Sequence, residues 1–428
     1  MRSWREETVM IVVLFLVGLA AAQQQPVPGS RTSTPYTTTC RLVAISSVDG
    51  TGIADGSITC TGPGTPVMLS VSSDLNKFSS KFSGGSAGAL SIDSSRVLID
   101  SSNFANNTGA AGGAIQVQGQ SSVGVTNTTF LGNVNANSQG GGLAVAPGGL
   151  VQVVNSQFTA NSASRGGAIY TSAASLSVIN SQFTQNTAKT TGGATYTADS
   201  SAVTLLNSTF SGNTAGALCL VVRALGGAVA SDSTQTTIGG CIFSNNAALS
   251  QGGALYQSNT TGDVTTCTFS GNKAANGGAV YQNLAQSNVI RTAFDGNAAS
   301  QKGGALFSTS STGNIMNSTF TSNKAVQSGG GVFQNDCASS ISFSIFSKND
   351  GGSLGGGGIY RNACEGFTIN CSFIQNTSAQ GGAIYQNNCI SNNIRATVFN
   401  GNNAQEGSTL FLNNSVPVND PGRLPVYS

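Results

Sequence analysis

The chain has 428 residues, of which only 8% are charged and 39% are hydrophobic, and its formal net charge is +2. This apolar content excludes a disordered chain, and the lack of clustered Lys and Arg excludes electrostatic capture of nucleic acid or an anionic membrane. Because the sequence holds no histidine, catalytic triads and metal sites that depend on imidazole are excluded as well.

The first 22 residues are typical of a secretory signal peptide. Arg2 and Arg5 precede an apolar run over residues 9–22, and cleavage is expected before Gln23. The run has 14 residues, fewer than the roughly 20 of a membrane-spanning helix, so an uncleaved anchor is the weaker alternative. No later stretch is apolar enough to span a membrane. We therefore expect a secreted or cell-surface protein whose mature chain has no membrane span.

Residues 23–89 precede the regular part of the sequence. Residues 23–35, rich in Pro, Ser and Thr, predict a flexible leader, and residues 36–89 contain strand-like stretches without a full repeat. Such a segment is typical of the capping unit that protects the first coil of a repeat protein. Cys40 and Cys60 lie in this cap, and we predict a disulfide between them.

Residues 90–415 contain two alternating motifs. The first, Phe-x-x-Asn, begins at Phe104, Phe130, Phe158, Phe183, Phe210, Phe243, Phe269, Phe294, Phe320, Phe346, Phe373 and Phe399. The second is Gly-Gly-Ala/Gly, followed by a residue that is usually aliphatic and then by a residue that is often Tyr. It begins at Gly112, Gly140, Gly166, Gly192, Gly226, Gly252, Gly277, Gly303, Gly329, Gly356 and Gly381. Copies lie 25 to 28 residues apart, except for one interval of 33 or 34. This regularity predicts a solenoid.

The units of the repeat are strands. Alternation such as Leu176-Ser177-Val178 has the period of a β-strand, and no helical pattern occurs beyond the signal. Short strands cannot bury an apolar face alone, so successive units must stack. We therefore predict an all-β fold, a single-stranded right-handed parallel β-helix of about twelve coils and roughly 60 Å in length.

In such a helix, equivalent residues of successive coils lie above one another. The phenylalanines are expected to stack in the interior, and the asparagines to form a ladder at turns with left-handed backbone. Paired glycines allow the backbone to turn sharply and then to pass close to the next coil.

One full copy of both motifs is GGAIYTSAASLSVINSQFTQN, from Gly166 to Asn186. Over residues 104–402 the motifs resemble the GGA(I/L/V) and FxxN repeats of the chlamydial polymorphic outer-membrane proteins. The resemblance implies a pectin-lyase-like parallel β-helix that is exposed at a surface and takes part in adhesion. The C-terminal outer-membrane domain of that family is not recognised before Ser428, so autotransport is not expected. Similar repeats also occur in larger extracellular proteins of eukaryotic microbes.

Two segments depart from the regular pattern. The long interval has about eight extra residues within 214–225, and two alternatives remain open: a loop that bulges from the helix, or an error in the predicted coding sequence. After a degraded glycine motif at Gly407, residues 416–428 are expected to form a loose tail.

Other cysteines share positions in adjacent repeats. Cys337, Cys364 and Cys389 should stack within about 5 Å of each other, which is disulfide range, so we predict disulfide bonding there. Cys241 and Cys267 occupy the position two before Phe, which elsewhere holds Ser or Thr, and we expect them to be small buried residues. No two cysteines have the spacing of a zinc motif, and no metal or cofactor is expected.

Eight sequons make the protein a candidate glycoprotein, provided that the host has the machinery and the side chains point outward. The asparagines are Asn106, Asn127, Asn207, Asn259, Asn317, Asn370, Asn376 and Asn413.

A column of tyrosines is the best candidate for binding, because aromatic faces in a row can stack on sugar rings or pack on a protein. Its members are Tyr170, Tyr196, Tyr256, Tyr281, Tyr360 and Tyr385. The alternative is that the stacked rings only stabilise the sheet.

Parallel β-helices also include polysaccharide lyases, hydrolases and epimerases, which need paired carboxylates or a bound Ca²⁺. The nearest approach to such a cluster is Asp336, Arg361 and Glu365 on two adjacent coils, whereas the other acids scatter. We expect these charges to be a solvated turn. The sequence therefore favours a surface scaffold or adhesin that binds an extracellular glycan or a surface protein without catalysis, with a polysaccharide-acting enzyme as the alternative.

Overall fold

The computed structural model describes residues 39–47, 54–61, 69–71, 75–83, 89–110, 112–216, 224–389 and 394–415. The predicted signal peptide (1–22), leader (23–35) and tail (416–428), and residues 217–223 of the insertion, lie outside the described residues. In the described parts the structure has no helix of the length and apolar character needed to cross a membrane.

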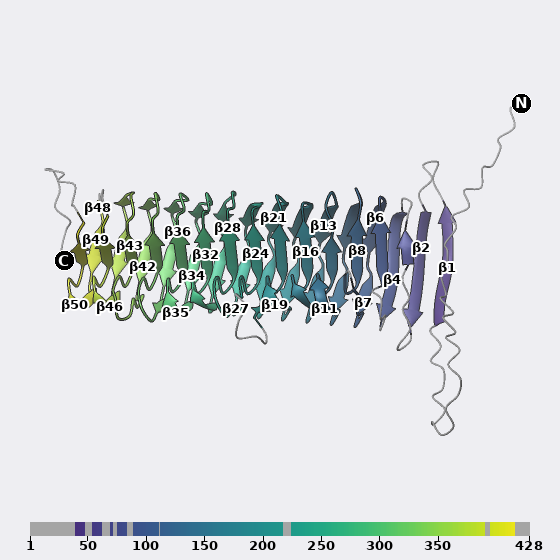
Figure 1. Ribbon diagram of the computed structural model, residues 1–428, viewed down its shortest axis with the longest axis horizontal. Helices are drawn as coiled ribbons and strands as arrows, with labels where there is room; N and C mark the ends of the chain where they lie inside the picture. Colours follow the sequence, from purple (N-terminus) through teal and green to yellow (C-terminus); the bar gives the residue numbers. More distant parts are fainter. Residues whose placement is uncertain are drawn as a thin grey trace, which may run out of the picture.

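The chain winds into a long rod of stacked coils (Figure 1). A representative coil contains β16 (Ile169–Ser172), β17 (Ser175–Ile179), β18 (Gln182–Thr184) and β19 (Thr187–Thr191). Each of these strands pairs in parallel with its equivalent in the next coil. About twelve such turns make a right-handed parallel β-helix, which confirms the predicted fold.

Equivalent strands form three long faces, which we call sheets 1, 2 and 3. Sheet 1 contains β1 (Thr39–Ser47), β2 (Ala54–Thr61) and β4 (Leu75–Ser83), and then two strands per coil: β6 (Arg96–Asp100), β7 (Asn103–Ala105), β9 (Ser122–Thr126), β10 (Thr129–Leu131), β13 (Leu150–Val154), β14 (Gln157–Thr159), β17, β18, β21 (Ala202–Leu206), β22 (Thr209–Ser211), β25 (Gln235–Gly239), β26 (Ile242–Ser244), β29 (Val264–Thr265), β30 (Thr268–Ser270), β33 (Val289–Ile290), β34 (Ala293–Asp295), β37 (Ile315–Met316), β38 (Thr319–Thr321), β41 (Ile341–Ser342), β42 (Ile345–Ser347), β44 (Thr368–Ile369), β45 (Ser372–Ile374), β48 (Ile394–Arg395) and β49 (Val398–Asn400).

Sheet 2 follows the glycine motif and contains β3 (Leu69–Val71), β5 (Leu90–Asp93), β8 (Ile115–Gln118), β12 (Leu143–Val145), β16, β20 (Thr195–Ala198), β24 (Val229–Asp232), β28 (Leu255–Ser258), β32 (Val280–Asn283), β36 (Leu306–Thr309), β40 (Val332–Asn335), β43 (Ile359–Asn362), β47 (Ile384–Asn387) and β51 (Leu410–Asn413). Sheet 3 contains β11 (Val134–Gln139), β15 (Ser162–Arg165), β19, β23 (Thr214–Ala215), β27 (Ala247–Ala248), β31 (Lys273–Asn276), β35 (Ala298–Lys302) and β39 (Lys324–Ala325), and a separate pair, β46 (Thr377–Gln380) and β50 (Asn403–Glu406), follows it.

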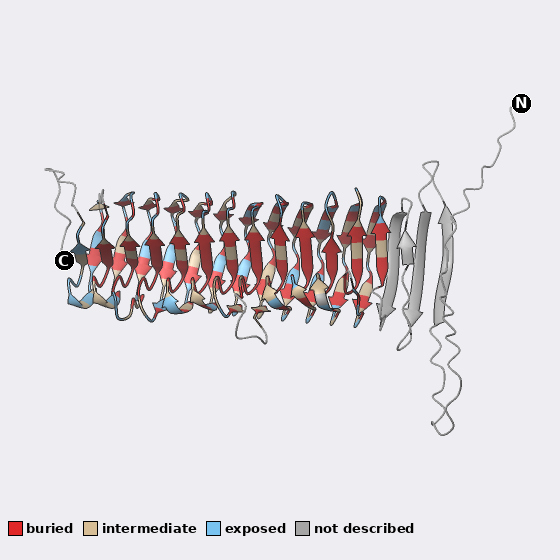
Figure 2. Cartoon of the chain, in the orientation of Figure 1, coloured by how far each residue is buried: buried red, intermediate tan, exposed pale blue. Residues whose placement is uncertain are grey.

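A column of phenylalanines forms the centre of the core. From Phe104 to Phe399, neighbouring rings stack with centroids 4.4 to 5.3 Å apart and planes within 18° of parallel. Aliphatic side chains from the sheets complete one continuous interior, which is buried along the length of the rod (Figure 2). The predicted ring-on-ring stacking is confirmed.

A ladder of buried asparagines runs beside the phenylalanines. Each amide donates to the next member, from Asn107 to Asn402, over 2.8 to 3.0 Å. The predicted ladder is therefore confirmed, but the expected backbone conformation is wrong. Positive φ belongs to the residue before each ladder asparagine, as at Asn106 (φ 54°) and Gln185 (φ 55°). The preceding residue makes the turn, so that the asparagine itself can point inward.

Each glycine of the paired motif has its own steric reason. Gly166 has φ of 59°, in the left-handed region that favours glycine. A Cβ on Gly167 would collide with the backbone carbonyl of Gly193 in the next coil. The first glycine therefore makes the turn and the second allows the close approach, as predicted.

The predicted cap has a different pairing from the coils. β1 pairs with β2 antiparallel, whereas β2 pairs with β4 in parallel, as the coils do. In this antiparallel pair Cys40 lies directly opposite Cys60. Opposed residues of antiparallel strands have Cα atoms about 4.5 to 5.5 Å apart, which is compatible with the disulfide that remains a prediction.

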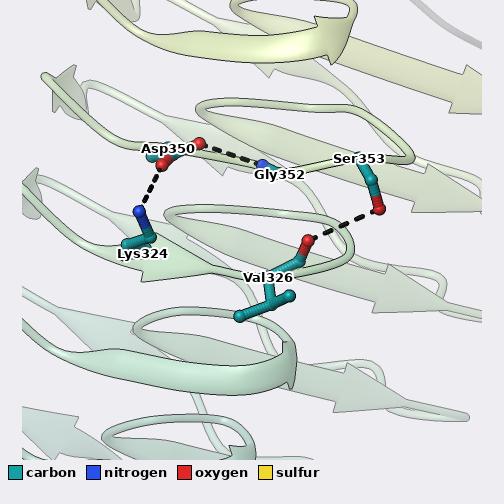
Figure 3. A network of polar contacts seen from close by, with 5 residues as sticks. All are labelled: Lys324, Val326, Asp350, Gly352 and Ser353. Atoms are coloured by element: carbon teal, nitrogen blue, oxygen red, sulfur yellow. Dashed lines mark hydrogen bonds and ion pairs between the residues drawn. The ribbon is translucent and has the colours of Figure 1, made fainter.

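Sheet 3 is interrupted in the coil that follows β39. There Oδ1 of Asp350 accepts a hydrogen bond from the backbone N–H of Gly352 over 3.0 Å (Figure 3). Oδ2 of the same carboxylate forms an ion pair with Nζ of Lys324 in the preceding coil, also at 3.0 Å. The hydroxyl of Ser353 donates to the carbonyl of Val326. Side-chain contacts thus add to the backbone hydrogen bonds between the two coils, where strand pairing is reduced to isolated bridges at Lys324–Asp350 and Ser328–Gly355.

Candidate functional site

A groove crosses the outer face of sheet 1 over the strands β6, β9, β13, β17 and β21. It has a volume of about 670 Å³ and is open to solvent. Every second residue of these strands points outward, because the alternate residues fill the core. Gly124 has no side chain, and Leu98 of the neighbouring coil lies close to it.

The lining of the groove is largely uncharged. Hydroxyl and amide groups come from Ser122, Gln152, Ser175, Ser177 and Thr204, and the aliphatic surface comes mainly from Leu98 and from Leu150, which is 53% exposed. Arg96 is the charged member, and none of the described residues that line the groove is acidic. This chemistry suits hydrogen bonding and apolar packing along an extended ligand.

The three residues of the weak catalytic cluster do not come together. Asp336 and Glu365 are exposed at turns, whereas Arg361 points into the interior and is 1% exposed. Its guanidinium donates to Gln334 and to two backbone carbonyls rather than to either acid. The expected solvated turn is therefore confirmed for Asp336 and Glu365 but wrong for Arg361, because Arg361 occupies an inward position of β43.

The tyrosine column is more buried than the sequence suggested. Tyr170, Tyr281 and Tyr385 are less than 10% exposed, and Tyr196, Tyr256 and Tyr360 are half-buried. From Tyr256 to Phe411 the rings stack on each other with centroids 4.6 to 5.6 Å apart, through Phe307 and Phe333, which the motif had not included. Because neighbouring rings occupy their faces, these faces are not open for stacking on a sugar.

Tyr196 also lies near charged side chains of neighbouring coils. Burial raises the pKa of Tyr196 to about 12, and the negative charge of Asp232 acts in the same direction. The guanidinium of Arg165 lies 6.0 Å from the ring centroid. A phenol with this pKa stays protonated at neutral pH, so Tyr196 is unsuited to act as a general base.

The described cysteines occupy two columns of small corner residues. Cys241 and Cys267 are buried in the place of Ser or Thr two residues before Phe, as expected, and Cys371 occupies the equivalent position. Cys337, Cys364 and Cys389 stack in a second column, at the turn between sheet 2 and sheet 1, in line with Ser311 and Ser415. Backbone N–H groups in this column donate to the Sγ or Oγ atom of the next coil.

All six of these residues carry a thiol and not a disulfide. The structure therefore does not contain the predicted disulfides at Cys337, Cys364 and Cys389. In-register parallel strands hold Cβ atoms about 4.8 Å apart, which is longer than a disulfide allows.

The sequons separate into two groups. Asn106, Asn127, Asn207, Asn259, Asn317, Asn370 and Asn413 are exposed. Asn376 is completely buried in the asparagine ladder, where it donates to Asn402 and to the carbonyl of Phe346. Asn376 therefore does not meet the condition that the side chain points outward, because the same Asn belongs to both the sequon and the ladder.

A polar column inside sheet 2 was not predicted. Thr171, Thr197, Ser231, Gln257, Gln282, Ser308, Gln334, Arg361 and Gln386 follow one another in register and point inward. The amide of Gln282, for example, donates to Gln257 over 3.0 Å. The signal was present in the sequence, because the second residue after each aliphatic position of the glycine motif becomes polar from Thr171 onward.

The sequence matches two protein-family models. The family model described as a right-handed beta helix region matches residues 58–221, 113–294 and 196–354, and the model of the Chlamydia polymorphic membrane protein repeat matches residues 370–387. A comparison with curated proteins found no sequence match.

Two solved structures show weak similarity. The crystal structure of the periplasmic alginate epimerase AlgG is 8% identical over 87% of this chain and 95% of that chain, with a TM-score of 0.31. The crystal structure of the Dettilon tailspike protein is 9% identical over 81% of this chain and 61% of that chain, with a TM-score of 0.27. Similarities this weak carry no argument about activity. The β-helix model, however, matches well over half of the chain, so the chain belongs to the right-handed β-helix family.

Proposed function

We propose that this protein is a secreted or cell-surface β-helical scaffold that takes part in adhesion and has no catalytic activity. The observation that carries the proposal is the groove on the outer face of sheet 1, which crosses five consecutive coils. At about 4.8 Å per coil, its four intervals span about 19 Å along the rod.

The chemistry of the groove favours a neutral extracellular glycan over a surface protein. Ser122, Gln152 and Ser175 offer hydrogen-bonding groups to sugar hydroxyls, and Leu98 and Leu150 offer aliphatic surface to the apolar faces of sugar rings. The absence of acidic side chains among the lining residues supports binding over cleavage, because lyases, hydrolases and epimerases depend on carboxylates or a bound Ca²⁺.

A substitution that fills the groove tests this function. Ser177 points outward from β17, so Ser177→Trp should occupy the groove without altering the core. Binding of the mature protein to a glycan array and to intact cells should fall at least tenfold. Ile345→Trp, at the exposed first position of the distant strand β42, is the matched control and should bind normally.

Several outcomes would contradict the proposal. Equal glycan binding by Ser177→Trp and the wild type would remove the groove as the site. Binding to cells that persists after their glycans are removed would favour a protein partner. Depolymerisation of a uronate polymer, with or without Ca²⁺, would favour the polysaccharide-acting enzyme.

A further inference from the structure

Arg361 is the largest fully buried side chain in the described part of the chain. It occupies the third position of β43 and lies in register between Gln334 of β40 and Gln386 of β47. Arginine keeps its proton in proteins, so a full positive charge lies inside the rod. Such a charge is costly unless an opposite charge balances it, because its hydration is lost.

The hydrogen-bond partners of Arg361 are all neutral. Nε donates to Oε1 of Gln334 over 2.9 Å, Nη1 to the carbonyl of Gly366 over 3.4 Å, and Nη2 to the carbonyl of Phe367 over 3.3 Å. A guanidinium has five N–H groups, and these contacts use three of them. The remaining N–H groups can therefore donate to a further acceptor.

No negative charge within the described ranges is paired with this cation. The carboxylates of the neighbouring turns, Asp336 and Glu365, are exposed, and the guanidinium contacts neither of them. The thiols of the nearby turns donate to backbone carbonyls, as from Cys364 to Asn362 over 3.1 Å, and a thiol that donates its proton is uncharged. The charge of Arg361 is therefore left without a counter-charge from these groups.

Two more polar side chains lie beside Arg361 without a hydrogen-bond partner. Thr368 follows Phe367, whose carbonyl accepts from Nη2, and it points inward from β44. Gln386 is in register with Arg361 in the next coil and is fully buried. The hydroxyl of Thr368 and both polar atoms of the Gln386 amide are unsatisfied by the protein. Buried polar groups are seldom left so, and these two border the same buried cation.

The hydroxyl of Thr368 interrupts an aliphatic column. From Ile99 to Ile394, the inward position five residues before the motif phenylalanine is Ile, Val or Leu in every coil except that of Thr368. Ile341 and Ile394 are its partners in the adjacent coils. The exception therefore removes apolar volume and adds a hydrogen-bond donor in the same coil that carries Arg361.

We propose that one chloride ion binds between the guanidinium of Arg361, the hydroxyl of Thr368 and the amide of Gln386. All three groups can donate hydrogen bonds, and chloride only accepts them. A monovalent anion balances one guanidinium. Water would satisfy the donors but leave the charge, and a divalent anion such as sulfate would leave a net negative charge in the same interior. The bound ion links the coil of β43 to the coil of β47.

Urea unfolding of the full-length protein tests the proposal. Chloride replaces gluconate at constant ionic strength, so that screening does not change. Since an anion that binds only the folded chain stabilises it, the unfolding equilibrium constant should fall about tenfold for each tenfold rise in chloride above its Kd. Arg361→Gln and Thr368→Ile should each abolish this dependence. Each substitution introduces the residue found at that position in the adjacent coils, so both variants are expected to fold.

Thr171→Val provides a matched control. Thr171 belongs to the same polar column as Arg361, and its buried hydroxyl also has no hydrogen-bond partner, but it lies on the distant strand β16. The change removes this hydroxyl and preserves the shape of the side chain. The variant should keep the full chloride dependence of the wild type.

Crystals grown with bromide in place of chloride locate the ion. An anomalous-scattering peak is expected between Arg361 and Gln386, within hydrogen-bond distance of the guanidinium, and it should be missing in Arg361→Gln. Ordered water alone at this place, or no peak at all, would overturn the proposal. A chloride dependence that is equal in the wild type and in Arg361→Gln would overturn it as well.

Discussion

Single residues determine how polar groups are satisfied inside this rod. Each ladder asparagine uses its amide twice: Asn272, for example, donates to Oδ1 of Asn297 and to the carbonyl of Phe243. Its Oδ1 accepts from both the backbone N–H and the side chain of Asn246. Buried polar groups are costly only when they are left unpaired, so the ladder is a stable core element.

Replacing one ladder member should therefore destabilise the protein. Asn272→Ala leaves two donors of Asn246 and the carbonyl of Phe243 without their partner, and the expected loss in free energy of unfolding is about 3 kcal/mol. Asn400→Ala, at an exposed position of β49, is the control and should change stability by less than about 0.5 kcal/mol. Urea denaturation of the two variants measures the difference. A ladder variant as stable as the control would contradict the role assigned to the ladder.

The same column predicts which sequon stays unmodified. If the protein is made in a glycosylating host, Asn376 should carry no glycan in the folded protein, because its side chain is buried and fully hydrogen-bonded. Asn370, six residues earlier and exposed, is the internal control. Mass spectrometry of glycopeptides measures the glycan occupancy of Asn376 and of Asn370. Folded protein with a glycan on Asn376 would be incompatible with the ladder.

At the scale of the element, the motifs were sufficient to predict which residues line the core. Phe and Asn recur at fixed spacing, and strand periodicity then fixes the inward face. The position of the left-handed residue was not predictable in the same way, since that position holds Asn, Gly, Ala, Gln, Ser or Lys in different coils. What the residues share is a conformation and not a side-chain type.

The candidate site was much less predictable than the core. The groove depends on small differences between coils, such as Gly124 beside Leu98, that leave the repeat motif unchanged. The sequence next to Arg361 is typical of a turn, although Arg361 shares a position with Gln334 and Gln386. Comparing each residue with its equivalents in the neighbouring repeats would have placed it inside.

Two glycines of one coil allow steric crowding and backbone conformation to be separated. A Cβ at Gly278 would collide with the backbone of the next coil, whereas Gly296 has φ of 62° and open space around it. Gly278→Ala should cost about 3 kcal/mol or more, since two coils must move apart. Gly296→Ala should cost about 1 to 2 kcal/mol from the left-handed backbone alone. Thermal unfolding of the two variants gives the comparison, and an equal cost would contradict the close approach of the coils.

At the scale of the whole molecule, the protein is a rod in which β1 and β50 lie at opposite ends (Figure 1). Because each coil contacts chiefly its neighbours, stability is expected to be a sum of local terms. A rod of this kind can present a groove at a defined distance from its ends, which fits the proposed scaffold.

The central claim is that equivalent residues of successive coils lie in register along one axis. Two pairs of spin labels test this claim. The pair at Gln157 and Thr319 occupies equivalent positions six coils apart, and the pair at Gln157 and Val398 occupies equivalent positions nine coils apart. Pulsed electron paramagnetic resonance should give distances of about 29 Å and about 43 Å, in proportion to the number of coils. Two distances that do not differ, or that fall far from this proportion, would contradict the stacked architecture and the function proposed for it.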